Sequence, residues 1–485
     1  MFNAAGSSRD MARLSKRLKE WVTGMAEEFL SEAMDYIDHW LECQKLQDRQ
    51  TPGYSVAISH KGEILYKQAF GYAYLETQEK MTPAHLFRVA SHSKTFTAIA
   101  IMQLMAAGKL SIYEPAARYL PFLKENPDKR LQDVTIEQML CHGSGICGNG
   151  EDPSFWGLEK RYPTKGEMVS FFKTEPLVIE SDVRFKYSNY AYGLLGWIVE
   201  EVSGLSYADY MREQILKPLG LKRIGAEYDP ESGPYVTGYT PLLPDGKQAP
   251  MGVSSNTGEL VGATGFYSDA ESLCRFYSAV IPGSGLLLPD DLKRKMLSRK
   301  WDMPDEDTKR GYALGFLCDE QDGRALKGHY GGMPGNMTQT LFDGQDDVVV
   351  SVLTNSQAGK PDILQKGIWH IIDFFKAHYE EPSPYKKYAG QFYDIWETFR
   401  FVPLGKKIYV SVPTEAEPFK NCSELTHQKG NIFKITKETG YGSYGEAVEF
   451  VMEGKDVKRV KYGGFPKYAK QDYLDYIEKV KKKYN

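Results

Sequence analysis

The chain has 485 residues, more than the roughly 250–300 that one hydrophobic core usually serves, so two or three domains are expected. Hydrophobic residues make up 42% of it and charged residues 26%, a composition that fits an ordinary globular protein and argues against disorder. Its 60 Lys and Arg residues nearly balance its 64 Asp and Glu residues, and the net charge of -4 excludes the basic field of a protein that binds nucleic acid or an anionic membrane.

The N-terminal segment, residues 1–49, is predicted to form an amphipathic helix, because apolar residues recur every three or four positions from Met11 to Trp40. We expect this helix to cover the core of its own domain; a subunit contact in a homo-oligomer is the alternative. The first residues lack the apolar stretch of a secretory signal, so we expect a cytoplasmic protein, or an exported one if a signal peptide has been removed. No run of about 18 apolar residues exists, so no transmembrane segment is expected.

Residues 50–378 are predicted to form one large domain that begins with a β-hairpin and a buried helix. Two β-prone runs at 54–58 and 63–70 flank a turn that contains glycine, which is typical of a hairpin. Residues 91–107 are apolar on almost every side after their first turn. A helix with this composition is expected inside a core, where every face contacts other apolar groups.

Between about residues 110 and 310, helical patterns alternate with loops rich in Gly and Pro, at 166–173, 191–203 and 269–281. β-prone runs return at 337–342 and 348–354. The N-terminal and C-terminal strands can therefore share one sheet, with a helical lobe inserted between them.

The C-terminal part, residues 385–485, is predicted to be a separate β-rich domain. A short helix at 364–377 leads to an acidic break that contains proline, which is typical of a linker. Beyond it, short β-type runs follow at near-regular spacing, at 399–402, 407–412, 432–435, 448–452 and 457–462. This spacing favours a small β-barrel or sandwich that is lipocalin-like. The lysine-rich end, 468–484, is interpreted as a solvated surface helix.

The pattern Ser-x-x-Lys occurs three times, at Ser91, Ser170 and Ser383. About two chance occurrences are expected in a chain of this length, so the context must decide between them. Ser383 lies in the linker and Ser170 near an exposed helix end, and neither needs a function. Ser91 instead opens the most apolar helix of the chain, and Lys94 lies three residues further on the same face.

Ser91 and Lys94 together meet a requirement of nucleophilic catalysis. A serine hydroxyl attacks poorly at neutral pH unless a base removes its proton. Lysine is such a base only when it is neutral, and burial beside an apolar helix, near the positive end of the helix dipole, disfavours its charged form. The alternative for this helix alone is a serine N-cap with a lysine that extends to solvent.

A second motif, Tyr187-Ser-Asn189, stands directly before the predicted helix at 191–203 and is the only Tyr-x-Asn in the chain. A phenol close to a lysine can share one proton with it, so the pair serves as base during attack and as acid toward the leaving group. Either Lys94 or Tyr187 can be the general base at this stage. Asn189 carries an amide that can orient Lys94 and bind a substrate carbonyl.

A third motif, His329-Tyr-Gly331-Gly332, precedes the returning strands. Glycines let a backbone approach a ligand closely, so an N–H of this strand can join that of Ser91 in an oxyanion hole. A glycine-rich turn with one histidine is by itself more often only a turn. Three such motifs in this order, each beside the expected element, indicate a serine nucleophile at Ser91 and a substrate-binding strand at His329.

These motifs resemble the Ser-x-x-Lys, Tyr-x-Asn and Lys-Thr-Gly or His-x-Gly motifs of the penicillin-recognising serine hydrolases. That family includes class C β-lactamases, DD-peptidases, D-aminopeptidases and esterases, and the chain is most similar to the last two. The resemblance covers roughly residues 50–376. It implies an α+β fold of the β-lactamase/transpeptidase type, with an antiparallel sheet flanked by helices plus a helical lobe. It also implies oxyanion donors at the backbones of Ser91 and Gly332.

Two departures from the family pattern bear on the substrate. His329 stands where β-lactamases carry lysine, which removes a permanent positive charge for a substrate carboxylate, so efficient β-lactamase activity is not expected. The family's Pro-Gly ahead of Tyr-x-Asn is replaced by Ser181-Asp182, which predicts a different loop on that side of the pocket. By the same comparison His142 is interpreted as structural. The C-terminal domain is similar to β-barrel domains appended to several D-aminopeptidases.

We therefore expect a serine hydrolase that forms an acyl-Ser91 intermediate on a small amide, a short peptide that can contain a D-residue, or an ester. A slow-turnover penicillin-binding sensor and an acyltransferase are the alternatives. Neither a metal nor an organic cofactor is expected, since the nine histidines show no ligand spacing. The six cysteines form no CxxC pair and are expected to be reduced, with a disulfide between Cys141 and Cys147 as the alternative.

Overall fold

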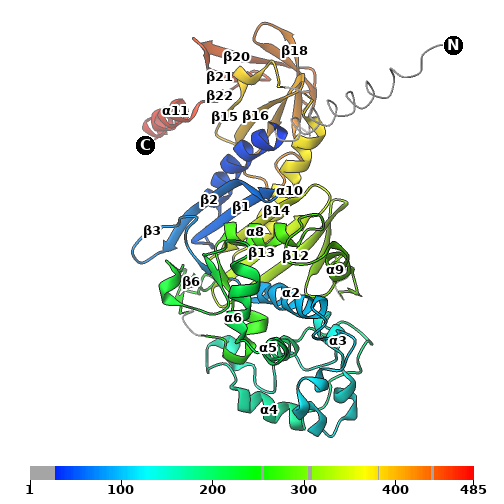
Figure 1. Ribbon diagram of the computed structural model, residues 1–485. Helices are drawn as coiled ribbons and strands as arrows, with labels where there is room; N and C mark the ends of the chain where they lie inside the picture. The colour runs from blue at the N-terminus through cyan, green and yellow to red at the C-terminus, as the bar shows by residue number, and fades with distance from the viewer. Residues whose placement is uncertain (1–27, 253–255, 304–308, 381, 439–441, 485) are drawn as a thin grey trace, which may run out of the picture. The chain divides into compact units, whose positions relative to one another are not determined.

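The computed structural model describes residues 28–252, 256–303, 309–380, 382–438 and 442–484 (Figure 1). The chain divides into two compact units. One unit comprises Arg49–Gln365, and the other joins the described residues up to Asp48 with those from Lys366 onward. The domain boundaries expected from the sequence stay predictions.

A nine-stranded antiparallel sheet forms the framework of the Arg49–Gln365 unit, in the order β3-β2-β1-β14-β13-β12-β11-β10-β9. Its strands are β1 (Gly53–His60), β2 (Glu63–Tyr74), β3 (Glu79–Lys80), β9 (Trp301–Asp302), β10 (Gly311–Tyr312), β11 (Leu317–Gln321), β12 (Arg324–Met333), β13 (Asn336–Asp343) and β14 (Val348–Thr354). Strand β1 pairs with β14, from Tyr54 opposite Thr354 to His60 opposite Val348. The predicted sharing of one sheet by the N-terminal and C-terminal strands is confirmed.

Helices cover the sheet and build a lobe beside it (Figure 1). They are α2 (Ser93–Ala106), α3 (Ile136–Leu140), α4 (Lys165–Thr174), α5 (Asn189–Ser203), α6 (Tyr207–Met211), α7 (Val261–Thr264), α8 (Ala270–Val280) and α9 (Asp290–Met296). Helix α8 packs on β1 and β14, whereas α2 packs against α5 and α7. One core runs through both parts and includes Ala57 and Val349 of the sheet, Phe96 of α2 and Leu194 of α5. Because α2 is enclosed on all sides, its apolar residues need no polar face.

Shorter elements complete this unit. A three-stranded sheet consists of β4 (Phe87–Arg88), β8 (Tyr267–Ser268) and β5 (Ile224–Gly225), and β6 (Gly238–Tyr239) pairs with β7 (Pro250–Met251). Short 3₁₀ helices lie at Ala90–His92, Ala116–Arg118, Pro121–Glu125, Lys129–Asp133, Ser154–Gly157, Pro230–Ser232 and Gly258–Leu260, and a π-helical turn lies at Arg212–Leu216. The turn at Ala90–His92 precedes α2 directly and positions Ser91.

The second unit contains a closed barrel of eight antiparallel strands. They are β15 (Gly390–Tyr393), β16 (Thr398–Leu404), β17 (Lys407–Ser411), β18 (Ser423–Lys429), β19 (Ile432–Lys437), β20 (Ala447–Glu453), β21 (Asp456–Tyr462) and β22 (Phe465–Tyr468). A core of Phe392, Phe401, Leu425, Phe433 and Phe450 fills it. The predicted small C-terminal β-barrel is confirmed, and with the sheet and lobe it completes the predicted α+β fold.

Three helical segments precede or follow the barrel strands in the chain. Residues 28–47 are helical, and this helix contacts the barrel's own unit through Trp40 Nε1, which donates to the Glu415 carbonyl at 2.9 Å. Residues 1–27 of the predicted helical segment 1–49 lie outside the described residues. Helix α10 spans Pro361–His378, and α11 spans Lys470–Tyr484. None of the side chains of α11 is buried, which agrees with the prediction of a solvated helix.

Candidate active site

Ser91 lies in the 3₁₀ turn Ala90–His92, one turn ahead of α2, which begins at Ser93. The long helix therefore starts two residues later than its composition predicts. Ala90 adopts a left-handed backbone with φ of 44°, a conformation that costs a non-glycine residue about 1–3 kcal/mol and that the surroundings must hold in place. Ser93 Oγ holds it by donating to the Ala90 carbonyl at 2.5 Å. Ser91 is half-buried while its neighbours are buried, so this residue is the partly exposed one of the turn.

Lys94 is fully buried, and the three groups that its Nζ contacts are uncharged. Nζ lies 2.7 Å from Asn189 Oδ1, 2.9 Å from the Ala263 carbonyl oxygen and 3.3 Å from Ser91 Oγ. Burial lowers the pKa of the Lys94 amine well below its usual 10.5, because a charged ammonium loses its hydration there. The amine is therefore neutral over a wider range of pH than an exposed lysine.

A neutral amine has two N–H donors and one lone pair, and the groups around Lys94 determine where each of them points. The two shorter contacts, with Asn189 Oδ1 and the Ala263 carbonyl, are to acceptors that take the two N–H groups. The remaining direction is toward Ser91 Oγ. A lone pair in that direction can accept the hydroxyl proton, so the geometry fits the base role that the sequence predicts for Lys94.

Tyr187 approaches the same hydroxyl from the other side and donates a hydrogen bond from Oη to Ser91 Oγ at 2.8 Å. Burial raises the pKa of the Tyr187 phenol well above its usual 10, so the phenol keeps its proton. Lys94 Nζ lies 4.7 Å from the centroid of the Tyr187 ring. The structure thus brings together the serine, lysine and tyrosine that the sequence singled out.

Asn189 begins α5 and connects Lys94 to a neighbouring loop. The preceding residue, Ser188, is the N-cap of α5, and its Oγ accepts the N–H of Ala191 at 3.0 Å. Asn189 Oδ1 accepts from Lys94, and Nδ2 donates to Asn149 Oδ1 at 2.7 Å. Asn189 therefore orients Lys94, and its predicted contact with a substrate carbonyl stays a prediction.

Strand β12 passes close to Ser91 because Gly331 has no side chain. A Cβ on Gly331 would lie 2.0 Å from the carbonyl oxygen of Val89, two residues ahead of Ser91. Pairing between β11 and β12 ends at Gly328, so this part of β12 has an open edge.

The register of β12 directs the N–H of Gly332 to that open edge. Met333 and Asn336 close the β12–β13 hairpin across a two-residue turn and bond to each other. Backbone groups alternate in direction along a strand, so those of Gly331 face β13 and those of Gly332 face away from it. The Gly332 amide is thus available as the second oxyanion donor that the family resemblance implies.

His329 lies on the face of β12 that Gly331 turns toward Val89, and its ring is enclosed there with its centroid 6.1 Å from that of His92. Its side chain is fully buried, with Nε2 2.9 Å from Tyr312 Oη, and burial lowers its pKa to about 3. The ring is therefore neutral, and its predicted contact with a substrate stays a prediction. The sequence reasoning missed Tyr330, which is 38% exposed and close enough to raise the pKa of Tyr187. Successive side chains of a strand point to opposite faces, so Tyr330 could have been placed on the face opposite His329 from the sequence.

The loop ahead of Tyr187 carries Ser181-Asp182 in place of the family's Pro-Gly, and local hydrogen bonds hold it. Asp182 takes the left-handed conformation, with φ of 60°, that glycine would adopt more easily. Its N–H donates to the Gly143 carbonyl at 2.8 Å, and its Oδ2 accepts from Gln138 Nε2 at 2.6 Å. His142 is buried beside it and accepts the N–H of Ser188 at Nδ1, at 3.2 Å. This contact supports the structural interpretation of His142.

The described part of the chain gives little support to the other two Ser-x-x-Lys serines, a metal site or a disulfide. Ser170 lies exposed on α4, and Ser383 lies far along the chain from any second motif. No group of three or more His, Cys, Asp or Glu side chains suited to a metal occurs among the described residues. All six cysteines are free thiols, Cys141 and Cys147 included. Within the same residues no helix has the length and apolar character that crossing a bilayer requires.

The sheet, the helical lobe and the Ser91–Lys94–Tyr187 cluster define a protein of the β-lactamase/transpeptidase-like class. The Beta-lactamase family profile matches residues 30–368. The chain therefore belongs to the Beta-lactamase family, and the resemblance read from its motifs is confirmed.

Individual relatives are more distant. Protein flp of Staphylococcus aureus (strain MW2) is 28% identical over 194 residues, which cover 40% of this chain and 38% of that protein. The chain thus spans about two fifths of the length of this curated relative. A solved octameric penicillin-binding protein homologue from Pyrococcus abyssi has a TM-score of 0.60 at 24% identity, over 92% of this chain and all of that one. A D-stereospecific amidohydrolase from Streptomyces sp. has a TM-score of 0.59 at 24% identity, over 69% of this chain and 98% of the other. These likenesses show a shared fold.

Proposed function

We propose that the protein is a serine hydrolase that acts through an acyl-Ser91 intermediate. One observation carries this proposal: Oγ of the half-buried Ser91 lies 2.8 Å from Tyr187 Oη and 3.3 Å from Lys94 Nζ. A hydroxyl that contacts a neutral amine and a protonated phenol has a base and an acid at the same atom. A serine cap with a solvated lysine would leave the lysine exposed, but Lys94 is fully buried.

Acylation follows from these positions. Lys94 accepts the hydroxyl proton as Ser91 Oγ bonds to the substrate carbonyl carbon, and the carbonyl π electrons move to oxygen. The N–H groups of Ser91 and Gly332 stabilise this oxyanion. As the tetrahedral intermediate collapses, the bond to the leaving group breaks and Tyr187 gives the leaving group its proton. Tyr187 then recovers a proton from Lys94, whose ammonium becomes neutral again.

Deacylation repeats these steps with water as the nucleophile. Lys94 accepts a proton from the water as its oxygen attacks the acyl carbon, and Ser91 Oγ leaves with a proton from Tyr187. The acid is released and the hydroxyl of Ser91 is restored. A slow second half-reaction would turn the same site into a penicillin-binding sensor, and an alcohol or amine in place of water would make it an acyltransferase.

We propose a small amide, a short peptide or an ester as the substrate, with D-residues among the candidates. The absence of a permanent cation at His329 disfavours substrates that depend on a carboxylate at that position, since the imidazole is neutral at physiological pH. The fold shared with a D-stereospecific amidohydrolase supports amide substrates of D-configuration. The octameric homologue supports a homo-oligomer as the assembly.

Covalent labelling tests the nucleophile. A fluorophosphonate is expected to add one adduct to the full-length chain, mapped by peptide mass spectrometry to Ser91. The variant Ser91→Ala should lose both this adduct and turnover of p-nitrophenyl esters. Ser383→Ala is the matched control because it removes the serine of another Ser-x-x-Lys and should change neither. Undiminished turnover in Ser91→Ala would reject the proposal.

Substrate class and turnover are then separated by a screen. D- and L-aminoacyl amides are compared with short esters by kcat/KM, and penicillin is followed by intact mass. Faster turnover of a D-amide than of its L-enantiomer would support the stereochemical preference. A stable penicilloyl adduct without turnover of any amide or ester would instead favour the sensor. Competing alcohols and amines in the product analysis reveal acyl transfer.

A further inference from the structure

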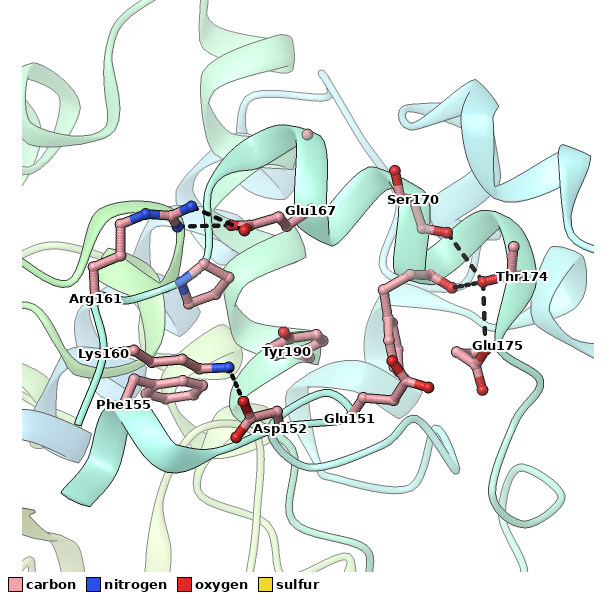
Figure 2. A pocket seen from close by; sticks show the side chains of 13 residues that line it. Glu151, Asp152, Phe155, Lys160, Arg161, Glu167, Ser170, Thr174, Glu175 and Tyr190 are labelled. Atoms are coloured by element: carbon pink, nitrogen blue, oxygen red, sulfur yellow. Dashed lines mark hydrogen bonds and ion pairs between the residues drawn. The ribbon is translucent and has the colours of Figure 1, made fainter. Parts of the chain in front are cut away.

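A cavity opens in the helical lobe and contains none of the three groups around Ser91 (Figure 2). Its volume is about 620 Å³, and it lies between the loop that begins at Glu151 and helix α4. Sites for small molecules usually have about 300–1,000 Å³, so the cavity can hold a ligand. One of its walls is Tyr190, which directly follows Asn189 at the start of α5.

The lining of this cavity carries more negative than positive charge. Its carboxylates belong to Glu151, Asp152, Glu167 and Glu175, and its cations to Lys160 and Arg161. Asp152 accepts from Lys160 at 2.5 Å, and Glu167 forms a two-point pair with Arg161 at 2.7 and 2.9 Å (Figure 2). Among the described residues no cation neutralises Glu151 or Glu175. Two carboxylates thus remain for a positively charged ligand.

Tyr190 adds an independent observation. The residue is only 6% exposed, yet its hydroxyl makes no hydrogen bond within the described part of the chain. Figure 2 shows its ring among the charged side chains that line the cavity. Burial raises the pKa of this phenol to about 12, so its oxygen stays a neutral acceptor. The hydroxyl reaches the cavity without a partner among the described residues, and an N–H donor of a ligand would give it one.

Aromatic rings complete the wall. Phe155 and Phe171 line the cavity beside Tyr190, and the rings of Phe171 and Tyr190 meet edge to face with centroids 5.2 Å apart. Aromatic faces attract cations and also contact the alkyl chains that carry them. We propose that this cavity binds an alkylammonium group, held by Glu151, Glu175 and the Tyr190 hydroxyl. The proposal does not depend on the reaction at Ser91.

The alkylammonium group has two natural sources, a free diamine and the side chain of a basic residue in a peptide. The probes are 1,5-diaminopentane for the first source and Nα-acetyl-L-lysinamide for the second. Their neutral counterparts of similar shape are 1,5-pentanediol and Nα-acetyl-L-norleucinamide. Calorimetric titration of full-length Ser91→Ala protein measures binding without turnover, so a failure of the proposed function leaves this test intact.

At least one cationic probe is expected to bind, and its neutral counterpart is not. Glu151→Gln and Glu175→Gln should each weaken binding about fivefold, the upper range for an accessible ion pair. Tyr190→Phe should weaken it too while leaving the melting temperature unchanged, because the hydroxyl has no partner to lose. Glu159→Gln removes an exposed carboxylate of the same loop outside the cavity and serves as the matched control.

Binding of the lysinamide alone would identify a peptide side chain as the source, and binding of the diamine alone a free polyamine. The proposal is overturned if neither cation binds or if the neutral counterparts bind as tightly. It is also overturned if Glu159→Gln weakens binding as much as Glu151→Gln, since the effect would then come from overall charge.

Discussion

Replacing Gly331 by alanine tests how strand β12 supplies the oxyanion donor. The new Cβ would lie 2.0 Å from the Val89 carbonyl oxygen, about 1.4 Å short of the 3.4 Å at which ordinary contact begins. The blocking atom belongs to backbone that leads directly to Ser91, so the strand must move away. A shift of this size takes the Gly332 N–H out of range of the oxyanion, and the loss of one such donor costs about 10²–10³ in kcat. The forced contact should also cost about 1–3 kcal/mol of stability.

The assay is kcat of a p-nitrophenyl ester, corrected for the folded fraction from a thermal melt. Gly344→Ala is the control because its Cβ would meet nothing closer than 4.0 Å, at Phe342 in the same sheet. We expect near wild-type activity from the control and at least a hundredfold loss in Gly331→Ala, with fluorophosphonate labelling slowed in parallel. If Gly331→Ala keeps its activity within threefold, the close approach of β12 to Ser91 is irrelevant to catalysis and the reasoning fails.

Three further predictions concern the proton path and the loop beside it. Tyr187→Phe should lower kcat/KM by about 10²–10⁴ at an unchanged melting temperature, and a smaller loss would remove Tyr187 as the acid. Lys94 binds its proton less readily in the folded protein than in the unfolded one. The free energy of unfolding of the wild type should therefore rise with pH between the lowered pKa of folded Lys94 and 10.5, by at most about 1.4 kcal/mol per pH unit. Activity should fall as acid protonates the amine. Urea titrations of Lys94→Met at several pH values should show an unfolding free energy without this rise. If its pH dependence equals that of the wild type, Lys94 is charged in the folded protein. Asp182→Ala should lower the free energy of unfolding by about 1–2 kcal/mol, and Asp182→Gly by less, because glycine adopts a positive φ without strain. Equal losses of the two variants in denaturant melts would contradict that ranking.

The catalytic cluster could be predicted from the sequence because its parts are local. Ser91 and Lys94 are three residues apart at a helix start, a spacing that places their side chains on one face. Tyr187 and Asn189 stand before an amphipathic helix, and the N-cap Ser188 holds that turn in place. The hydrophobic patterns similarly predicted the hairpin at His60, the buried α2, the central strands β1, β2, β13 and β14 of the large sheet, and most strands of the barrel.

Other features depended on neighbours that the sequence does not specify. The short barrel strands β15, β18 and β22 were not predicted, because they are short or largely polar and close the barrel by pairing rather than by apolar alternation. The cavity around Tyr190 combines a loop, α4 and the start of α5, and nothing in their patterns shows that two of its carboxylates lack a cationic partner.

What the sequence determined by itself was the identity of the reactive groups and the elements that carry them, because short-range spacing and hydrophobic periodicity act within one segment. Which side of β12 faces the site was decided only by tertiary structure. The register with β13 and the end of pairing with β11 enclose His329, expose Tyr330 and direct the Gly332 N–H to the open edge. A one-residue change of that register would reverse all three, since successive residues of a strand face opposite ways.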